Sequence, residues 1–205
     1  MVRVLTHYPN NKQRLFFAKT FGCVRFVYNK MLADRIDSYK EFPQNMDRSI
    51  KYSTPAEYKA DFPFLKEVDS LALANAQLNL NKAYTNFFRD KSVGFPRFKS
   101  KKDTHRIYTT NNQKGTVYIE NGCIKLPKLK TLIRIKQHRQ FLGLIKSVTI
   151  SQTPTGKYFV SVLVEENEQL FSKIDTKVGI DIGLKDFAIL SRGCCKTHKY
   201  PNMNA

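Results

Sequence analysis

In the first ninety residues, apolar side chains recur every three or four positions, which is the spacing of amphipathic helices. After an apolar strand at residues 1–5, Asn10 and Gln13 form a capping box that predicts the start of a helix. We expect this helix to end at Gly22 and a second helix to run from about residue 24 to 40. Two helices joined at a glycine resemble a helix-turn-helix, but such pairs are more often plain packing than DNA readers.

A third long helix is predicted from Ser70, a possible N-cap, to Arg89. It follows a polar stretch at 41–61 that ends in a short helix. One face of the long helix is an apolar stripe, and the opposite face is rich in amides. Because amides pair with base edges, Ser70, Gln77 and Asn81 are candidate nucleic-acid contacts, although a solvated face is the commoner explanation.

From residue 106 the apolar period changes to two, which is typical of strands. Turn residues such as Asn121-Gly122 separate six of them. The predicted strands are 106–110, 116–120, 123–126, 132–137, 145–153 and 157–165. Six strands without a helix predict a small barrel or a curved sheet.

The last apolar stretch, residues 177–191, predicts two short strands around a tight turn that Gly183 opens. Asp181 lies within the first strand, where a charge is costly unless it is paired or binds a metal. It either caps the turn or pairs with a nearby lysine, or it holds Mg²⁺, which prefers carboxylate oxygens. Composition alone leaves both alternatives open.

The chain has 205 residues and 41% hydrophobic content, enough for one or two small domains with cores. It contains no apolar run near 18 residues, so we expect no membrane span. The first residues lack the apolar segment of a signal peptide, which predicts a cytoplasmic protein. The four cysteines form no C-x-x-C pair, so we expect neither a zinc site nor a disulfide framework.

Charge points to a polyanionic partner. The net charge is +18, and the stretch from Arg89 to Lys146 holds 15 Lys/Arg against 3 Asp/Glu. Aromatic residues interrupt this basic stretch, which favours nucleic-acid binding over a merely solvated face. The candidate phosphate contacts are Arg25, Arg97, Lys99, Lys101, Lys102, Arg134, Lys136 and Arg139.

Several stretches, taken in order, resemble TnpB, the OrfB-type protein of bacterial insertion sequences. They are Tyr8-Pro9, FGCVRFVYN at 21–29, GFPRFKSK at 94–101, IKLP at 124–127, IKSVTI at 145–150 and GIDIGLKDFAIL at 179–190. Their joint order is far more specific than any one of them, and they span most of residues 5–191.

The resemblance implies an α+β fold in which a helical recognition lobe is inserted into a wedge-like β-barrel. The barrel is followed by the first β-hairpin of an RNase-H-like (RuvC) nuclease domain. The implied parts are 1–9 (first barrel strand), 10–105 (recognition lobe), 106–175 (barrel) and 176–205 (nuclease start). Relatives are RNA-guided DNA endonucleases, so the implied partners are guide RNA and target DNA, and the implied cofactor is Mg²⁺.

Asp181 matches the first catalytic aspartate of the family, which also needs a glutamate and a further aspartate, usually with a zinc-binding insert between them. Here Asp186 is the only carboxylate after Asp181, and it occupies a non-catalytic position. We therefore expect a protein truncated inside its nuclease domain that does not cleave DNA.

Three alternatives remain open. The chain is a binding-only repressor guided by RNA, a decayed insertion-sequence remnant, or an actin-like ATPase, whose phosphate loop opens with a similar motif. The ATPase ranks lowest because Leu184 and Lys185 follow the motif, where such enzymes carry small hydroxyl residues.

Overall fold

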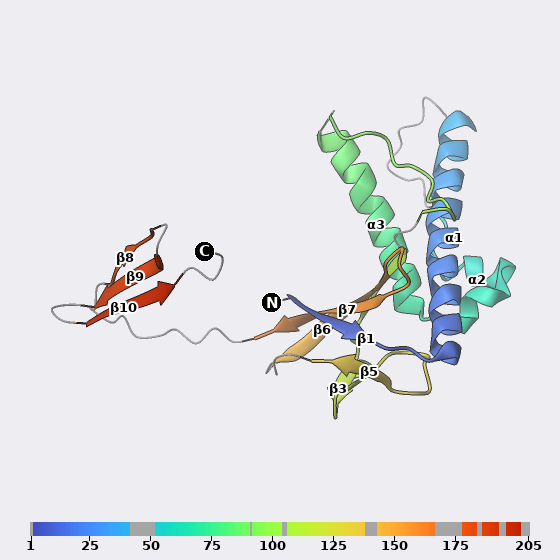
Figure 1. Ribbon diagram of the computed structural model, residues 1–205. Coiled ribbons are helices and arrows are strands. Elements are labelled where there is room, and N and C mark those ends of the chain that lie inside the picture. The colour runs from blue at the N-terminus through green and yellow to red at the C-terminus, as the bar shows by residue number, and fades with distance from the viewer. Residues whose placement is uncertain are drawn as a thin grey trace. The chain divides into compact units, whose positions relative to one another are not determined.

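The computed structural model describes residues 2–41, 52–90, 92–103, 106–137, 143–166, 178–183, 186–192 and 196–201 (Figure 1). The chain divides into two compact units, Met1–Asn167 and Glu168–Ala205. The first unit combines helices with a seven-stranded sheet, and the second contains a three-stranded sheet. The predicted α+β class is confirmed.

The helices of the first unit are α1 (Asn11–Glu41), α2 (Tyr58–Asp61), the 3-10 helix η1 (Pro63–Glu67) and α3 (Ser70–Arg89). Helix α1 begins with the predicted capping box. The Asn10 N–H donates to Gln13 Oε1, and the Gln13 N–H donates to Asn10 Oδ1, both at 2.9 Å. The Gln13 amide also donates to Thr131 Oγ1 at 2.9 Å and Leu132 O at 3.0 Å, which ties the start of the helix to the sheet.

Helix α1 continues through Gly22, so the predicted helix end at this glycine, and the two-helix turn that depends on it, are wrong. A glycine inside a helix costs about 1 kcal/mol relative to alanine. The neighbouring Phe17, Phe21 and Val24 are all buried, and burying one such side chain contributes about 1.5–3 kcal/mol. Packing of α1 therefore outweighs the local tendency of glycine to end a helix.

Helix α3 has the predicted bounds, but its N-cap is displaced by one residue. Asp69 has the extended backbone of an N-cap, and Ser70 is the first helical residue. The Ser70 hydroxyl instead accepts a 2.6 Å hydrogen bond from Lys59 Nζ. The Asp69 carboxylate accepts a short hydrogen bond from buried Thr110 on β2, which attaches the start of α3 to the sheet.

The seven-stranded sheet is antiparallel and curls into a half-barrel. Its order is β2-β6-β7-β1-β5-β4-β3, so β2 and β3 are its edges. The strands are β1 (Val2–His7), β2 (Arg106–Asn111), β3 (Tyr118–Glu120), β4 (Cys123–Lys125), β5 (Ile133–Lys136), β6 (Leu144–Gln152) and β7 (Tyr158–Glu165). The curved sheet, one of the two predicted forms, is confirmed. The N-terminal strand β1 lies between β7 and β5 in the sheet. In the sequence, all the helices come between β1 and the other six strands of this sheet.

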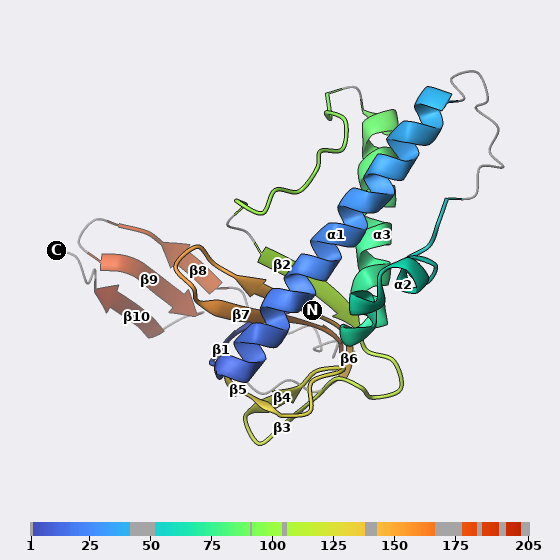
Figure 2. The same ribbon diagram turned by 90° about the vertical axis from the view of Figure 1, so that its right-hand side faces the viewer.

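Helices α1 and α3 cover the same face of this sheet (Figure 2). On β7, buried and less buried residues alternate as a half-buried strand requires. Phe17 of α1 lies with its ring centroid 5.8 Å from that of Tyr158 on β7 and 6.4 Å from that of Tyr108 on β2. The core of the first unit therefore lies between α1 and the inner face of the half-barrel.

His7 belongs to this core. Its ring centroid is 5.4 Å from that of Phe17 and 5.3 Å from that of Tyr158, and the residue is 2% exposed. Neither ring nitrogen has a hydrogen-bond partner among the described residues. Burial lowers the pKa of His7 to about 4, because a charged imidazolium would lose its hydration there. The side chain is therefore neutral at physiological pH.

The second unit has the strand order β10-β9-β8, all antiparallel, with β8 (Val178–Asp181), β9 (Asp186–Arg192) and β10 (Lys196–Pro201). The predicted pairing of the two strands around Gly183 is confirmed, with Val178 opposite Arg192 and Asp181 opposite Ile189. Strand β10 was not predicted, because its sequence, KTHKYP, has neither apolar alternation nor a β-branched run.

Candidate nucleic-acid interface

The chain from 92 to 103, which we call the basic segment, follows α3 without forming a helix or strand (Figures 1 and 2). Asn29 of α1 holds it by two hydrogen bonds to the backbone of Lys99. Asn29 Nδ2 donates to Lys99 O at 2.9 Å, and Lys99 N donates to Asn29 Oδ1 at 2.8 Å. Two stretches that are 70 positions apart in the sequence, and that both carried the family resemblance, thus lie against each other.

Lys99 itself is turned inward. Its Nζ lies 4.2 Å from the centroid of the Tyr28 ring, in a cation–π contact. The side chain is half-buried, and desolvation lowers the pKa of Lys99. Its ammonium is therefore less available to a phosphate than the sequence suggested, and Lys99 acts first as an anchor.

The other cations of the basic segment are exposed. Arg97, Lys101 and Lys102 all face solvent. Phe95, by contrast, packs edge-on against Tyr84 and Phe87 of α3, with ring centroids 5.6 and 5.4 Å away. One aromatic side chain and one lysine thus hold the segment in place, while three cations point outward. An exposed row of this kind is suited to phosphate groups.

The predicted amide face of α3 is only partly available. Ser70 is engaged with Lys59, and Asn81 Oδ1 accepts a hydrogen bond from Arg35 of α1. Arg35 also lies over the ring of Tyr84, 5.1 Å from its centroid. Gln77 is half-buried, and its side chain makes no hydrogen bond within the described part of the chain. These three candidates therefore do not form one free polar surface.

A second basic group lies on the half-barrel. Arg134 and Lys136 are exposed on β5, while Ile133 and Ile135, which alternate with them, are buried. Strand β5 is near the start of α1, whereas the basic segment lies along its middle (Figure 1). Gln13 and Asn29, which mark these places, are separated by about 24 Å along the helix axis. Arg25, on α1 between them, is half-buried, and Arg139 lies outside the described residues.

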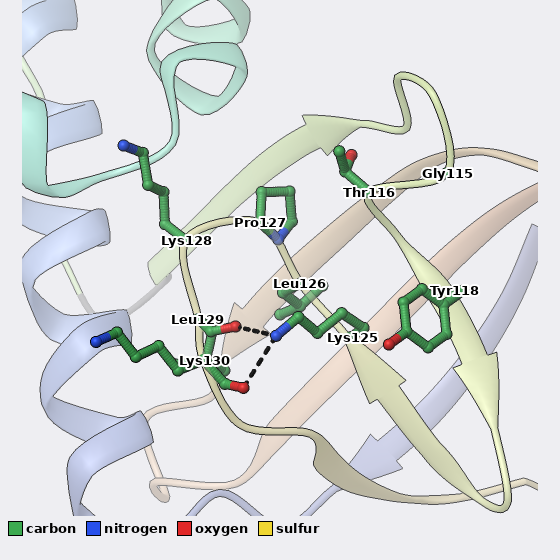
Figure 3. Close-up of a pocket in the computed structure, with 9 residues that line it drawn as sticks. All are labelled: Gly115, Thr116, Tyr118, Lys125, Leu126, Pro127, Lys128, Leu129 and Lys130. Atoms are coloured by element: carbon green, nitrogen blue, oxygen red, sulfur yellow. Dashed lines mark hydrogen bonds between the residues drawn. The ribbon is translucent and has the colours of Figure 1, made fainter.

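A pocket of about 410 Å³ lies beside the β3–β4 hairpin (Figure 3). We call it the hairpin pocket. Its lining residues are Gly115, Thr116, Tyr118, Lys125, Leu126, Pro127, Lys128, Leu129 and Lys130. Lys125 Nζ donates to Leu129 O at 2.6 Å and to Lys130 O at 3.0 Å, so this lysine braces the wall of the pocket. Apart from its lysines and one tyrosine, nothing in the sequence pattern predicts this pocket, because its two walls meet only in the folded hairpin.

Asp181 lies exposed at the end of β8, opposite Ile189. Among the residues that the structure describes, no group of three or more His, Cys, Asp or Glu side chains is placed to hold a metal ion. A single exposed carboxylate does not fit a two-metal phosphodiesterase centre, which needs several oxygen ligands. None of the described helices is long and apolar enough to cross a membrane.

Comparison with known proteins bears on the whole chain. Residues 7–43 match a family of the OrfB (IS605) type, described as a helix-turn-helix domain. In this structure the matched range contains one continuous helix, α1, from Asn11 to Glu41.

A protein from Streptomyces pristinaespiralis is 30% identical over 190 residues, which cover 91% of this chain and 46% of that protein. InsQ of Escherichia coli K12 is 31% identical over 188 residues, which cover 90% of this chain and 46% of InsQ. Both are named "Putative RNA-guided DNA endonuclease". Virulence protein VsdF of Salmonella dublin is 34% identical over 104 residues, covering 46% of this chain and 87% of VsdF.

The chain thus spans about half the length of the two relatives that are named as endonucleases, covering 46% of each. The similarity extends across about nine-tenths of the chain, including both its helical region and its half-barrel. Together with the OrfB-type match at the N-terminal helix, it identifies the chain as a member of the TnpB family, the OrfB-type proteins of bacterial insertion sequences.

Proposed function

We propose that this chain binds RNA and DNA as a TnpB-type RNA-guided protein, and that a protein of these 205 residues does not cleave DNA. The observation that carries the binding proposal is the anchored basic segment. Two hydrogen bonds from Asn29 fix its backbone on α1, while Arg97, Lys101 and Lys102 remain exposed. A fixed row of cations binds a phosphate backbone with less loss of conformational freedom than a loose one.

Within the described part of the chain, no ion pair neutralises the exposed cations of the proposed interface. Four ion pairs occur in the described part of the chain: Lys19–Glu67, Lys30–Asp34, Lys40–Asp37 and Lys146–Glu165. The exposed cations of the basic segment take part in none of them, and neither do Arg134 and Lys136 of β5. Their charge is available to phosphates, and binding should therefore weaken steeply as salt rises.

The proposed division of labour follows from the chemistry of these contacts. Phosphate contacts hold a strand but carry no sequence information, so base pairing by a guide RNA would have to supply the sequence selectivity. Of the three predicted amide-face residues, Ser70 and Asn81 are engaged within the protein. We keep Gln77 as the proposed contact to a base edge.

The proposal on cleavage rests on the missing carboxylates. A two-metal phosphodiester displacement needs oxygen ligands that fix both ions and orient the attacking water. Asp181 supplies one carboxylate, and Asp186 is the only one after it in the sequence. We therefore propose that these 205 residues do not by themselves assemble an RNase-H-type centre, and that Mg²⁺ binds only weakly at Asp181.

One experiment tests both parts. The protein is purified from cells that express it, copurifying RNA is sequenced, and that RNA is used as guide on a matched DNA target with Mg²⁺. InsQ, of which this chain spans 46%, serves as the longer comparison. We expect bound RNA and guided DNA binding, with no cutting by the wild type or by Asp181→Ala. Absence of any RNA or DNA binding at low salt would refute the binding proposal. Guided cutting that Asp181→Ala abolishes would refute the proposal on cleavage.

A further inference from the structure

We propose that the hairpin pocket binds one unstacked nucleobase of a single-stranded RNA on the ring of Tyr118. The inference rests on the proposed nucleic-acid binding and adds to it a specific base-binding site. Its starting observation is that Tyr118, on β3, is 42% exposed and makes no aromatic ring contact among the described residues. Pro127, which is half-buried, lines the same pocket and supplies an apolar surface (Figure 3).

The pocket is held open by its own contacts. Lys125 lies opposite Tyr118 in the hairpin, and its ammonium donates hydrogen bonds to the carbonyls of Leu129 and Lys130. Lys128 has a positive φ of 64°, which fixes a sharp turn in the same wall. Leu126 and Leu129 are both buried and secure the two sides of this turn. The wall is therefore braced away from the tyrosine ring before any ligand arrives.

The charge around the pocket selects a polyanion. Lys128 and Lys130 are exposed at its rim, and neither takes part in an ion pair within the described residues. Both point away from the centre of the pocket in Figure 3, so they are placed to meet phosphates outside it. Glu120 is the only carboxylate between residues 104 and 164. An apolar aromatic interior with a cationic rim matches a nucleotide, whose base is flat and whose phosphates are anionic.

The form of the nucleic acid follows from the geometry. In a duplex the faces of the bases are covered by their neighbours, so a ring inside a pocket cannot stack on them. A single strand can turn one base out of its stack at small cost. The volume of about 410 Å³ also lies in the usual range of small-ligand sites. We therefore assign the pocket to a base of a single strand rather than to a duplex.

The test compares two ten-unit probes with equal numbers of phosphates, an adenosine RNA and an abasic strand. We expect the wild type to bind the adenosine strand more tightly. Tyr118→Leu should weaken that binding by about 5- to 150-fold, the loss typical of one base–aromatic stack, and leave the abasic strand unaffected. Tyr118→Phe keeps the ring and should bind like the wild type.

Each other outcome is decisive. Equal wild-type affinity for both probes would show phosphate binding alone, and would overturn the inference while leaving the proposed function standing. Equal losses for Tyr118→Leu on both probes would overturn it too. Failure of the wild type to bind either probe would instead refute the proposed function.

A second measurement does not depend on a variant. In the wild type, photocross-linking to a 5-bromouridine RNA should label the tryptic peptide 115–125, in which Tyr118 is the sole aromatic residue. Labelling confined to other peptides would overturn the inference.

Discussion

Two basic regions of the first unit contain the same kinds of side chains and use them in opposite ways. In the basic segment, the ring of Phe95 packs against Tyr84 and Phe87 of α3, Lys99 covers Tyr28, and the remaining cations are exposed, as is Phe98. In the hairpin pocket, Tyr118 is exposed and makes no ring contact among the described residues, while the Lys125 ammonium is hydrogen-bonded to the wall of the pocket.

The difference shows that an aromatic–basic composition does not by itself say which residue meets the ligand. In the basic segment Phe95 and Lys99 hold the backbone and the other three cations are available, which suits a phosphate chain. In the hairpin pocket a cation holds the backbone and the ring is available, which suits a base. One region would fix the strand in place, and the other would hold one of its bases.

The largest expected effect comes from removing the exposed cations of the basic segment. The triple variant Arg97→Gln, Lys101→Gln, Lys102→Gln should lose roughly a hundred-fold or more in RNA affinity at 50 mM salt, and its log–log salt slope should fall by about 2 to 3. Filter binding over a salt series measures both. The control replaces three other exposed lysines, Lys12, Lys66 and Lys157, by glutamine. Equal losses of affinity in the two triple variants would mean that the basic segment is not the site that binds the phosphates.

Acid should weaken the packing of α1 on the half-barrel, where His7 lies between Phe17 and Tyr158. The pKa of His7 is lowered to about 4 in the folded protein, whereas the unfolded chain takes up the proton near pH 6.5. The stability that neutral His7 contributes is therefore present above pH 6.5 and lost as pH falls towards 4, a loss on the order of 3 kcal/mol.

Urea unfolding between pH 7.5 and 4 would measure this loss. In His7→Phe the ring is kept and cannot titrate, so its stability should fall less over the same range. A parallel decline of the two proteins would exclude His7 as the source.

Releasing the basic segment should separate its anchoring from its charge. Asn29→Ala removes both hydrogen bonds to Lys99 and leaves the N–H and the carbonyl of Lys99 without these partners, at a cost of about 2 kcal/mol in the free energy of unfolding. RNA affinity should fall although no cation is lost. Asn75→Ala, on α3, is the matched control, because among the described residues the Asn75 amide donates only within its own helix, to Leu71 O. Unchanged RNA affinity in a destabilised Asn29→Ala would show that binding does not need a fixed segment.

The smallest effect tests the continuity of α1, along which strand β5 and the basic segment are spaced. A Cβ on Gly22 would meet nothing within 4 Å, so Gly22→Ala should stabilise the protein by about 0.5–1 kcal/mol. A glycine that ended one helix in the left-handed region would give the opposite sign, because alanine is strained there. Thermal and urea unfolding measure the change, and a destabilised variant would favour a helix-turn-helix over a continuous helix.

Local pattern was sufficient for the elements whose signals agree with their surroundings. The capping box of Asn10 and Gln13, the bounds of α3 and the alternation of β7 were all predicted, because neighbouring residues supply the hydrogen bonds or the period. The family resemblance also came from the sequence, since it depends on the order of short motifs. The amino-acid sequence thus determined the class of the fold, the family and the presence of a basic surface.

Tertiary structure decided what the pattern left open or got wrong. Gly22 stays helical because the burial of its neighbours outweighs a local penalty of about 1 kcal/mol. Lys99 turns inward because Asn29 and Tyr28, some 70 positions earlier, hold it. The hairpin pocket exists because Lys125 reaches two carbonyls across a turn. In the first two cases the deciding contacts join residues that are far apart in the sequence, so only the folded chain brings them together.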